Sequence, residues 1–229
     1  MRVLLAGGGN AEQSKKIDEF YMSSLSTRHI AYFPQAAVPK MFDLEYAEKW
    51  LKDRPAFTNV QVNSFLDLTK TSFDELQSYE TLFISGGNTF DLLDKFNQSG
   101  FLPILRRLAS MDKIIYGASA GAIVLGSDIL SAGIGPEADS NDTDMTNFEG
   151  ANLLHGYNVL THYKEDYEEL VKTFAKDQHA AIIAIPEEGG VFFDGSLLTN
   201  ISSTPVYVVS QQGALLICPD EVFRITNCT

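Results

Sequence analysis

Residues 113–126 read KIIYGASAGAIVLG, in which a run of apolar residues enters a Gly-x-Ser-x-Gly turn and a run of small residues leaves it. This pattern is typical of a strand that turns sharply into a helix and exposes a serine, here Ser119, at the tip of the turn. The glycines at positions 117 and 121 let the backbone close up, and the alanines beside the serine leave its hydroxyl accessible. Five loosely defined positions also match by chance, so the motif alone predicts a packed Gly/Ala turn equally well.

A second glycine turn follows an apolar run in residues 81–93, TLFISGGNTFDLL. Asn88 or Thr89 can cap the helix that begins there, and the backbone N–H groups of Gly86 and Gly87 can approach an anion closely. The turn is therefore a candidate for one half of an oxyanion hole. A plain glycine turn before a capped helix is the structural alternative.

Strand and helix patterns alternate on both sides of these turns. Apolar runs predict strands at 2–6, 30–33, 60–65, 158–160 and 181–185, and helical spacing predicts helices at 13–25, 43–54, 73–76, 101–110 and 167–176. This alternation predicts an α/β fold in which helices cover both faces of a mostly parallel sheet and ligands bind at the carboxyl ends of the strands. Short runs at 191–193, 197–198, 206–209 and 214–217 predict small C-terminal hairpins. Because no linker or repeat interrupts the chain, we expect one domain over residues 1–229.

Composition restricts the classes of partner. The chain has 229 residues and a formal net charge of −13, which disfavours nucleic acid and anionic membrane surfaces as partners. No apolar run is long enough to span a bilayer, and the apolar run at the N-terminus is too short for a signal peptide, so we expect a cytoplasmic protein. Cys218 and Cys228 form no cluster and are predicted to be free thiols.

Two segments resemble cofactor or metal sites but fail a closer comparison. Gly7-x-Gly9 would need a third glycine where Glu12 stands, and a carboxylate there would repel a pyrophosphate, so no dinucleotide is expected. The acidic segment 133–150 has calcium-loop spacing from position 139, but Asp144 stands at the sixth position and Gly150 at the twelfth. We therefore predict no metal and no cofactor, and interpret this segment as a solvated loop at the rim of a site.

A serine nucleophile needs a base to accept its proton and an acidic group to orient that base. Of the four histidines, His162 is the best candidate because it directly follows a predicted strand. The next strand ends in Glu187 and Glu188, either of which could orient the imidazole.

Taken together, these pieces resemble the peptidase E family of serine peptidases. The matching segments are SGGNTF at 85–90, GASAGA at 117–122, HY at 162–163 and IPE at 185–187, in the family's order over residues 1 to about 200. The resemblance implies a three-layer α/β/α sandwich of the class I glutamine amidotransferase type. It also implies that Ser119 is the nucleophile, that His162 is the general base and then acid, and that Glu187 holds the imidazole, with Glu188 as the alternative. The backbone N–H groups of Gly87 and Ala120 would form the oxyanion hole.

The substrate is less well determined by the sequence. The family includes dipeptidases that remove N-terminal aspartate, which need a cation for the substrate carboxylate. The predicted substrate-binding residues are Asn88, Tyr163 and Lys164, but the segment 164–169, KEDYEE, contains no arginine. The acidic loop around Asp142 would repel an acidic substrate and attract a free amine.

The leading hypothesis is a serine peptidase that hydrolyses small peptides through an acyl-enzyme, with N-terminal Asp dipeptides among the candidates. An esterase or amidase on the same fold and a non-catalytic relative that binds a small ligand remain the alternatives. The expected partner is a small peptide substrate. A homodimer that pairs through the helix at 101–110 also remains open.

Overall fold

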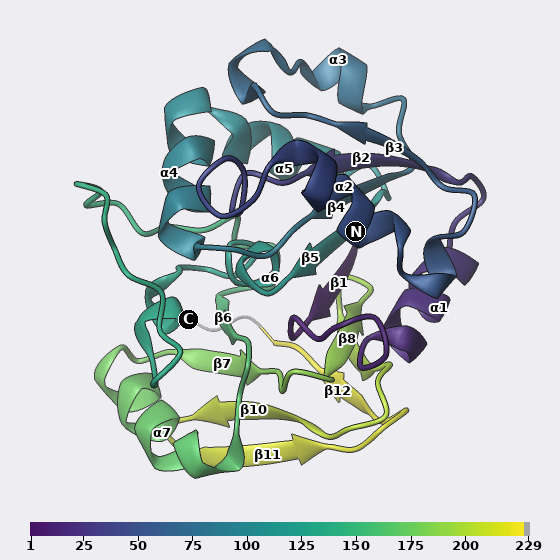
Figure 1. Cartoon of the computed structure of the whole chain (residues 1–229). Helices are drawn as coiled ribbons and strands as arrows, with labels where there is room; N and C mark the ends of the chain where they lie inside the picture. Colours follow the sequence, from purple (N-terminus) through teal and green to yellow (C-terminus); the bar gives the residue numbers. More distant parts are fainter. Residues whose placement is uncertain (227–229) are drawn as a thin grey trace.

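The computed structural model describes residues 1–226 and contains two sheets (Figure 1). The eight-stranded sheet has the order β12 (Val222–Arg224), β9 (Leu197–Asn200), β8 (Gly190–Phe193), β1 (Arg2–Ala6), β5 (Ile114–Ala118), β4 (Thr81–Ile84), β2 (His29–Phe33) and β3 (Gln61–Ser64). The four-stranded sheet has the order β11 (Gly213–Ile217), β10 (Val206–Ser210), β7 (Ala181–Ala184) and β6 (Tyr157–Leu160). Strands β1 to β5 pair in parallel, as the alternating pattern predicts.

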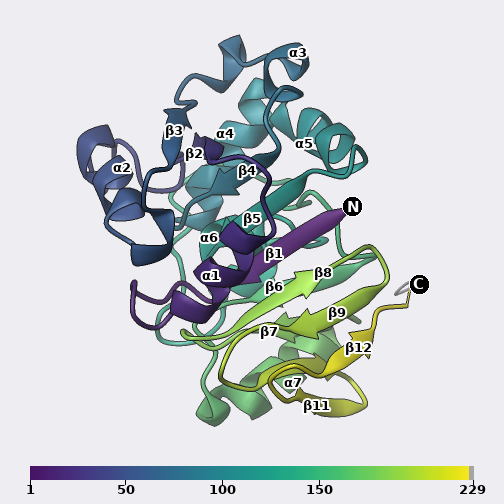
Figure 2. The ribbon, with the colours of Figure 1, turned by 90° about the vertical axis from the view of Figure 1, so that its right-hand side faces the viewer.

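The helices cover both faces of the large sheet (Figures 1 and 2). They are α1 (Lys15–Ser23), α2 (Leu44–Lys52), α3 (Phe73–Leu76), α4 (Thr89–Ser99), α5 (Phe101–Ala109) and α6 (Ala120–Ile123). Helix α7 (Glu168–Asp177) lies against the small sheet instead, and short 3₁₀ turns occur at Pro55–Phe57, Leu68–Lys70, Leu130–Gly133 and Glu165–Tyr167. Strand β1 is buried on both faces, and its side chains alternate between two cores. Val3 and Leu5 pack with the α4–α6 layer, whereas Leu4 packs with α1 and α2. The predicted three-layer arrangement follows from this alternation.

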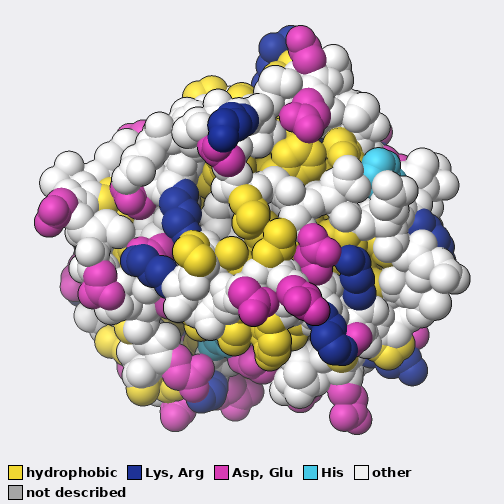
Figure 3. Space-filling view, turned by 45° about the horizontal axis from the view of Figure 1, so that its top comes forward, with side chains coloured by type: hydrophobic (Ala, Val, Ile, Leu, Met, Phe, Trp, Pro, Cys, Tyr) yellow, Lys and Arg dark blue, Asp and Glu magenta, His cyan; other side chains and the backbone are white. Residues whose placement is uncertain are grey.

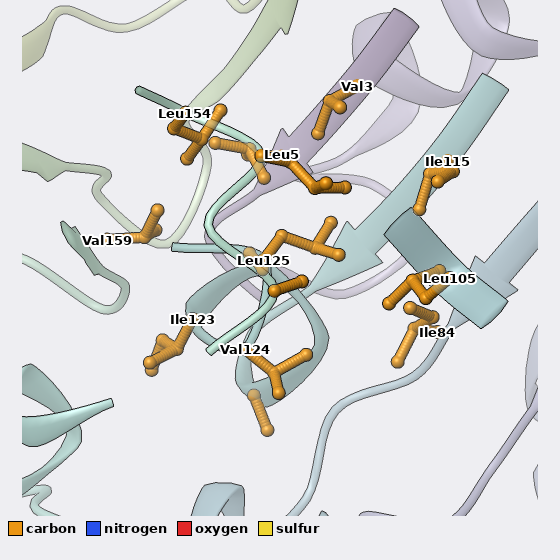
Figure 4. Packing of buried hydrophobic residues seen from close by; sticks show 14 of the residues in the cluster. Val3, Leu5, Ile84, Leu105, Ile115, Ile123, Val124, Leu125, Leu154 and Val159 are labelled. Atoms are coloured by element: carbon orange, nitrogen blue, oxygen red, sulfur yellow. The ribbon is translucent and has the colours of Figure 1, made fainter. Parts of the chain in front are cut away.

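The residues that follow Ser119 form the centre of one core. Ile123, Val124 and Leu125 lie among side chains from β1, β4 and β6, including Leu5 and Val159 (Figure 4). All of these side chains are almost completely buried, with at most 4% of their surface exposed. The motif that positions Ser119 is therefore anchored by apolar burial directly after it.

The C-terminal hairpins exist, but the structure distributes them between the two sheets. Strands β8 and β9 form an antiparallel pair that continues the large sheet, and β10 and β11 form a pair that continues the small one. Strands β6 and β7 begin the small sheet as a parallel pair. Helix α7 covers the outer face of the small sheet through Val171 and Ala175. The sequence patterns did not indicate that a second sheet would form.

The molecular surface is mixed in charge. The face shown in Figure 3 carries acidic and basic side chains around a central group of hydrophobic ones. Within residues 1–226, no helix combines the length and the apolar character that a membrane span requires. Cys218 is half-buried and unpaired within the same residues, and Cys228 lies outside the described residues.

Candidate active site

Five loops meet at the carboxyl ends of parallel strands and bring four predicted residues together with Gly8, which was not predicted. The loops after β1, β4 and β5 supply Gly8, Gly87 and Ser119, and the loops after β6 and β7 supply His162 and Glu187. The two sheets are joined here by backbone hydrogen bonds. The N–H of Gly9 donates to the carbonyl oxygen of Glu187 at 2.9 Å. The site therefore lies at the junction of the two sheets.

Ser119 adopts the strained conformation of a strand-to-helix elbow. Its backbone angles are φ 50° and ψ −118°, a region that residues with a side chain rarely occupy. The crossing of strand and helix requires glycine at position 117, because a Cβ there would lie 2.3 Å from the carbonyl oxygen of Gly121. The Ser119 N–H donates to the carbonyl oxygen of Ala6 at 3.0 Å, which ties the elbow to β1.

The serine hydroxyl lies beside the imidazole, and the imidazole lies beside a carboxylate. Ser119 Oγ is 2.7 Å from His162 Nε2, and His162 Nδ1 makes a short hydrogen bond with Glu187 Oε2. With the proton on Nδ1, the ring donates to Glu187 and accepts from the serine hydroxyl. The adjacent Glu188 points elsewhere and accepts from the side chain of Gln13 at 3.4 Å. The structure thus brings Glu187 rather than Glu188 to the histidine.

The charge environment of His162 raises its pKa. Burial by itself lowers the pKa of the imidazole, because the charged form loses its hydration. The hydrogen bond and negative charge of Glu187 oppose this effect, and Glu137 and Asp139 act in the same direction as Glu187. The net result is a pKa above the ordinary value for histidine.

Two backbone N–H groups adjoin the serine. Within residues 1–226, neither the N–H of Gly87 nor that of Ala120 donates to a protein acceptor. Gly87 has φ 139°, and a Cβ there would lie 2.3 Å from the carbonyl group of Ala36. Glycine is thus required at position 87, and both N–H groups remain available to a ligand oxygen.

Gly8 also lies in the site, although no sequence pattern indicated a catalytic role for it. It has φ 111°, and a Cβ at this position would lie 2.5 Å from Cε1 of His162. The flanking Gly7 N–H donates to the carbonyl oxygen of Gly189 at 3.0 Å. The N-terminal glycines at positions 7–9 do not form a dinucleotide-binding motif. They instead form the surface against which the imidazole of His162 packs.

Comparison with known proteins identifies the family of the chain. The model of peptidase family S51 matches residues 3–201. The chain belongs to peptidase family S51. Peptidase E of Haemophilus influenzae (strain PittGG) is 25% identical over 203 residues, covering 83% of this chain and 82% of that protein. Peptidase E of Pasteurella multocida (strain Pm70) is 26% identical over 211 residues, covering 87% of this chain and 86% of that protein.

A solved structure supports the fold. The crystal structure of a peptidase from an acI-B1 Actinobacterium superposes with a TM-score of 0.73 at 16% identity, covering 97% of this chain and 96% of that one. The expected family and the α/β/α fold are therefore confirmed. This member of family S51 is a serine-type peptidase.

The three residues predicted to bind substrate occupy different environments in this S51 peptidase. Asn88 caps α4 by accepting from the Asp91 N–H, and its amide donates to the carbonyl oxygen of Ser140 at 2.9 Å. Lys164 pairs with Glu137 at 2.5 Å on the rim. Tyr163 is 2% exposed and its ring packs 4.9 Å from that of Tyr207. The structure therefore places the Tyr163 side chain in the core, against the prediction that it contacts substrate.

Two cavities adjoin the serine and histidine. The first, of about 230 Å³, is mostly apolar and is walled by α2 and the segment before it, including Phe42, Tyr46 and Trp50. The second, of about 580 Å³, lies between α4 and the acidic loop. Its charged lining residues are Lys40, Asp91, Glu137, Asp139 and Asp142. Ser119, His162 and Gly87 line both cavities, so the candidate nucleophile stands where they meet.

Arg54 lines the apolar cavity and belongs to a buried ion pair. Arg54 Nε lies 2.7 Å from Asp18 Oδ2, and the two side chains are 3% and 1% exposed. The Tyr116 hydroxyl donates to the other carboxylate oxygen at 3.1 Å, and the guanidinium lies over the Trp50 ring at 4.6 Å. Burial raises the pKa of Asp18 although the Arg54 charge opposes that shift. The Arg54 charge is therefore already paired with a carboxylate.

We expect Arg54→Met to destabilise the protein by about 3–5 kcal/mol, because Asp18 would remain buried without its cation. Urea unfolding monitored by circular dichroism measures this change. Lys49→Met is the control, since Lys49 and Asp53 form an ion pair on the exposed face of α2 and such pairs contribute little. If both variants unfold at the same urea concentration, the buried pair does not have the stabilising role that its burial indicates.

Proposed function

We propose that this S51 peptidase hydrolyses small peptides through an acyl-enzyme formed on Ser119. The observation that carries the proposal is the continuous hydrogen-bonded arrangement of Ser119, His162 and Glu187, in which the serine Oγ lies 2.7 Å from His162 Nε2. This is the geometry in which a base can accept the hydroxyl proton without rearrangement. Esterase or amidase chemistry would use the same groups, and the peptidase family favours the peptide bond.

The reaction proceeds in two halves. His162 Nε2 takes the proton of Ser119 as Oγ attacks the peptide carbonyl carbon, and the imidazolium is stabilised by Glu187. The negative oxygen of the tetrahedral intermediate accepts from the N–H groups of Gly87 and Ala120, each of which contributes about 3 kcal/mol in comparable sites. The imidazolium then protonates the leaving amine as the C–N bond breaks. In the second half, His162 activates a water that attacks the ester carbon, and the carboxylic acid and free serine are released.

The second cavity favours a short peptide with a free amino group. Asp91, Glu137, Asp139 and Asp142 outnumber Lys40 in its lining, and Lys40 pairs with Asp91 at 2.7 Å. The acidic loop is held against α4 beside this cavity, because the Thr89 N–H donates to Asp139 at 2.8 Å. A negative space beside the nucleophile fits the ammonium end of a small peptide better than an acidic side chain.

Hydrolysis of a dipeptide panel tests the proposal. The panel carries Asp, Glu, Asn, Ala or Lys at the first position, and released amino acids are quantified by mass spectrometry. A fluorophosphonate probe, with peptide mapping of the adduct, tests the nucleophile without a substrate. We expect cleavage of at least one dipeptide and a phosphonate adduct on Ser119. Failure to cleave any dipeptide together with the absence of an adduct would overturn the assignment.

The pH dependence of kcat/KM should reflect the raised pKa of His162. Because the base must be neutral, activity rises as pH increases through this pKa, and we expect the midpoint of that limb above the ordinary histidine value. Glu137→Gln removes a charge that raises the pKa, so the midpoint should move to lower pH, most clearly at low ionic strength. Glu169→Gln, on the exposed face of α7, is the control and should leave the midpoint in place. An unchanged midpoint in Glu137→Gln would contradict the charge environment described above.

A further inference from the structure

The apolar cavity has the dimensions of a pocket for one side chain. Its volume of about 230 Å³ is below the range of pockets that hold a whole small ligand, about 300–1,000 Å³. It reaches the nucleophile itself, because Gly86, Ala118 and Ser119 line its inner end. A side chain that occupies it can therefore belong to the molecule that reacts at the serine.

The walls of this cavity are aromatic. Trp50 and Tyr46 project from α2 and Phe42 precedes that helix, and the rings of Phe42 and Tyr46 stack at 4.5 Å. Large apolar side chains remain exposed at its mouth, with Met41 at 55%, Phe42 at 39% and Tyr46 at 51%. Clustered aromatic surface beside a nucleophile gains most from burial against another apolar group.

The charges around both cavities oppose an acidic occupant. Within residues 1–226, each Lys or Arg that lines either cavity has a carboxylate partner: Arg54 pairs with Asp18 and Lys40 pairs with Asp91. Lys164 on the rim pairs with Glu137. A substrate carboxylate would have to compete with these partners or lose hydration without compensation. The apolar cavity therefore selects against Asp and Glu side chains.

We propose that this cavity is a specificity pocket that takes an aromatic or large aliphatic side chain of one of the two residues that flank the scissile bond. The proposal rests on the proposed function in that the side chain belongs to a peptide held at Ser119. Phe42, Tyr46 and Trp50 are the specificity-determining residues. The preferred substrates are apolar peptides rather than aspartyl ones.

Binding can be measured without catalysis because Trp50 is the only tryptophan of the chain. The Ser119→Ala variant is titrated with Phe-Ala, Ala-Phe, Ala-Ala, Asp-Ala and Ala-Asp, and tryptophan fluorescence is recorded. We expect a saturable change in fluorescence with Phe-Ala or Ala-Phe. The half-saturating concentration of that peptide should be at least about tenfold lower than the half-saturating concentration of Ala-Ala, Asp-Ala or Ala-Asp. The peptide that binds identifies which side of the scissile bond the pocket serves. Equal responses to all five peptides would overturn the proposal.

Kinetics of pocket variants give the second test. Wild type should cleave the preferred Phe peptide with kcat/KM at least about tenfold above the corresponding Ala peptide. Tyr46→Ala should reduce this ratio, and Tyr46→Arg should raise the relative use of the Asp peptide, because it places an unpaired cation at the exposed mouth. Leu170→Ala removes an equally exposed apolar side chain from α7 and should change neither ratio. Unchanged ratios in both Tyr46 variants would contradict the proposal.

These measurements separate the pocket from the chemistry. A selective fluorescence response without hydrolysis of any peptide would support the pocket while rejecting the proposed function. Hydrolysis that depends on Ser119 but shows no preference for apolar side chains, with no fluorescence response, would support the function while rejecting the pocket.

Discussion

Replacing Ser119 with alanine is expected to lower kcat for the best dipeptide by about 10⁵- to 10⁶-fold, to near the limit of detection. The reason is that no other group in the arrangement can form the acyl-enzyme, since His162 and Glu187 act only through the serine hydroxyl. KM should change much less, because the cavities on either side are intact. Steady-state kinetics with purified wild type and variant, at equal protein purity, measure the loss.

The control for this substitution is Ser78→Ala, which removes an exposed serine hydroxyl far along the chain from the elbow. It should retain wild-type kinetics. The thermal midpoint of Ser119→Ala should stay close to wild type, because alanine keeps the same Cβ in the strained elbow. A folded Ser119→Ala variant that keeps more than about 1% of wild-type kcat would exclude Ser119 as the nucleophile.

Replacing Glu187 with glutamine is expected to lower kcat by about 10³- to 10⁴-fold. The neutral amide cannot stabilise the imidazolium, and its NH₂ group can hold the wrong tautomer of His162. The pH dependence of activity gives a second measurement, because the loss of a purely structural contact would not shift the pKa seen in the profile. Without the Glu187 charge, burial dominates and the pKa of His162 falls, so the limb of rising activity should move to lower pH.

The neighbouring Glu188 provides a matched control. Glu188→Gln makes the same chemical change one residue further along, where the side chain contacts Gln13 instead of the imidazole. Its kcat should stay within about twofold of wild type. If Glu188→Gln lost more activity than Glu187→Gln, the assignment of the orienting carboxylate would have to be reversed.

Much of the fold could be predicted from local pattern. The apolar run, Gly-x-Ser-x-Gly turn and small-residue run around Ser119 predicted a strand, an elbow and a helix, and the structure has β5, the strained serine and α6 at those positions. Strand and helix alternation similarly predicted the parallel core of the large sheet. The elbow and the strand–helix alternation could be predicted because backbone strain and hydrophobic periodicity depend on residues that are close together in the chain.

The same local signals predicted where reactive side chains would gather. Ser119, His162 and the Glu187-Glu188 pair each follow a strand, and parallel strands deliver their carboxyl ends to one edge. Sequence spacing could not decide which of the two carboxylates faces the imidazole. Which carboxylate faces the imidazole depends on how the loop after β7 is held. That loop is held by a contact between residues far apart in the chain, because the Gly9 N–H donates to the carbonyl oxygen of Glu187.

Other features were decided by the tertiary structure alone. The requirement for glycine at position 8 arises from the imidazole of His162, and the burial of Tyr163 arises from Tyr207 in a strand of the second sheet. The apolar cavity exists because α2 carries aromatic side chains beside the elbow, and the Arg54 cation in its lining is paired because Asp18 lies next to it. The sequence by itself determined the elements and the kinds of side chain at their ends. Contacts between distant segments, which no local pattern encodes, decided how those ends are oriented and what shape of substrate they can accept.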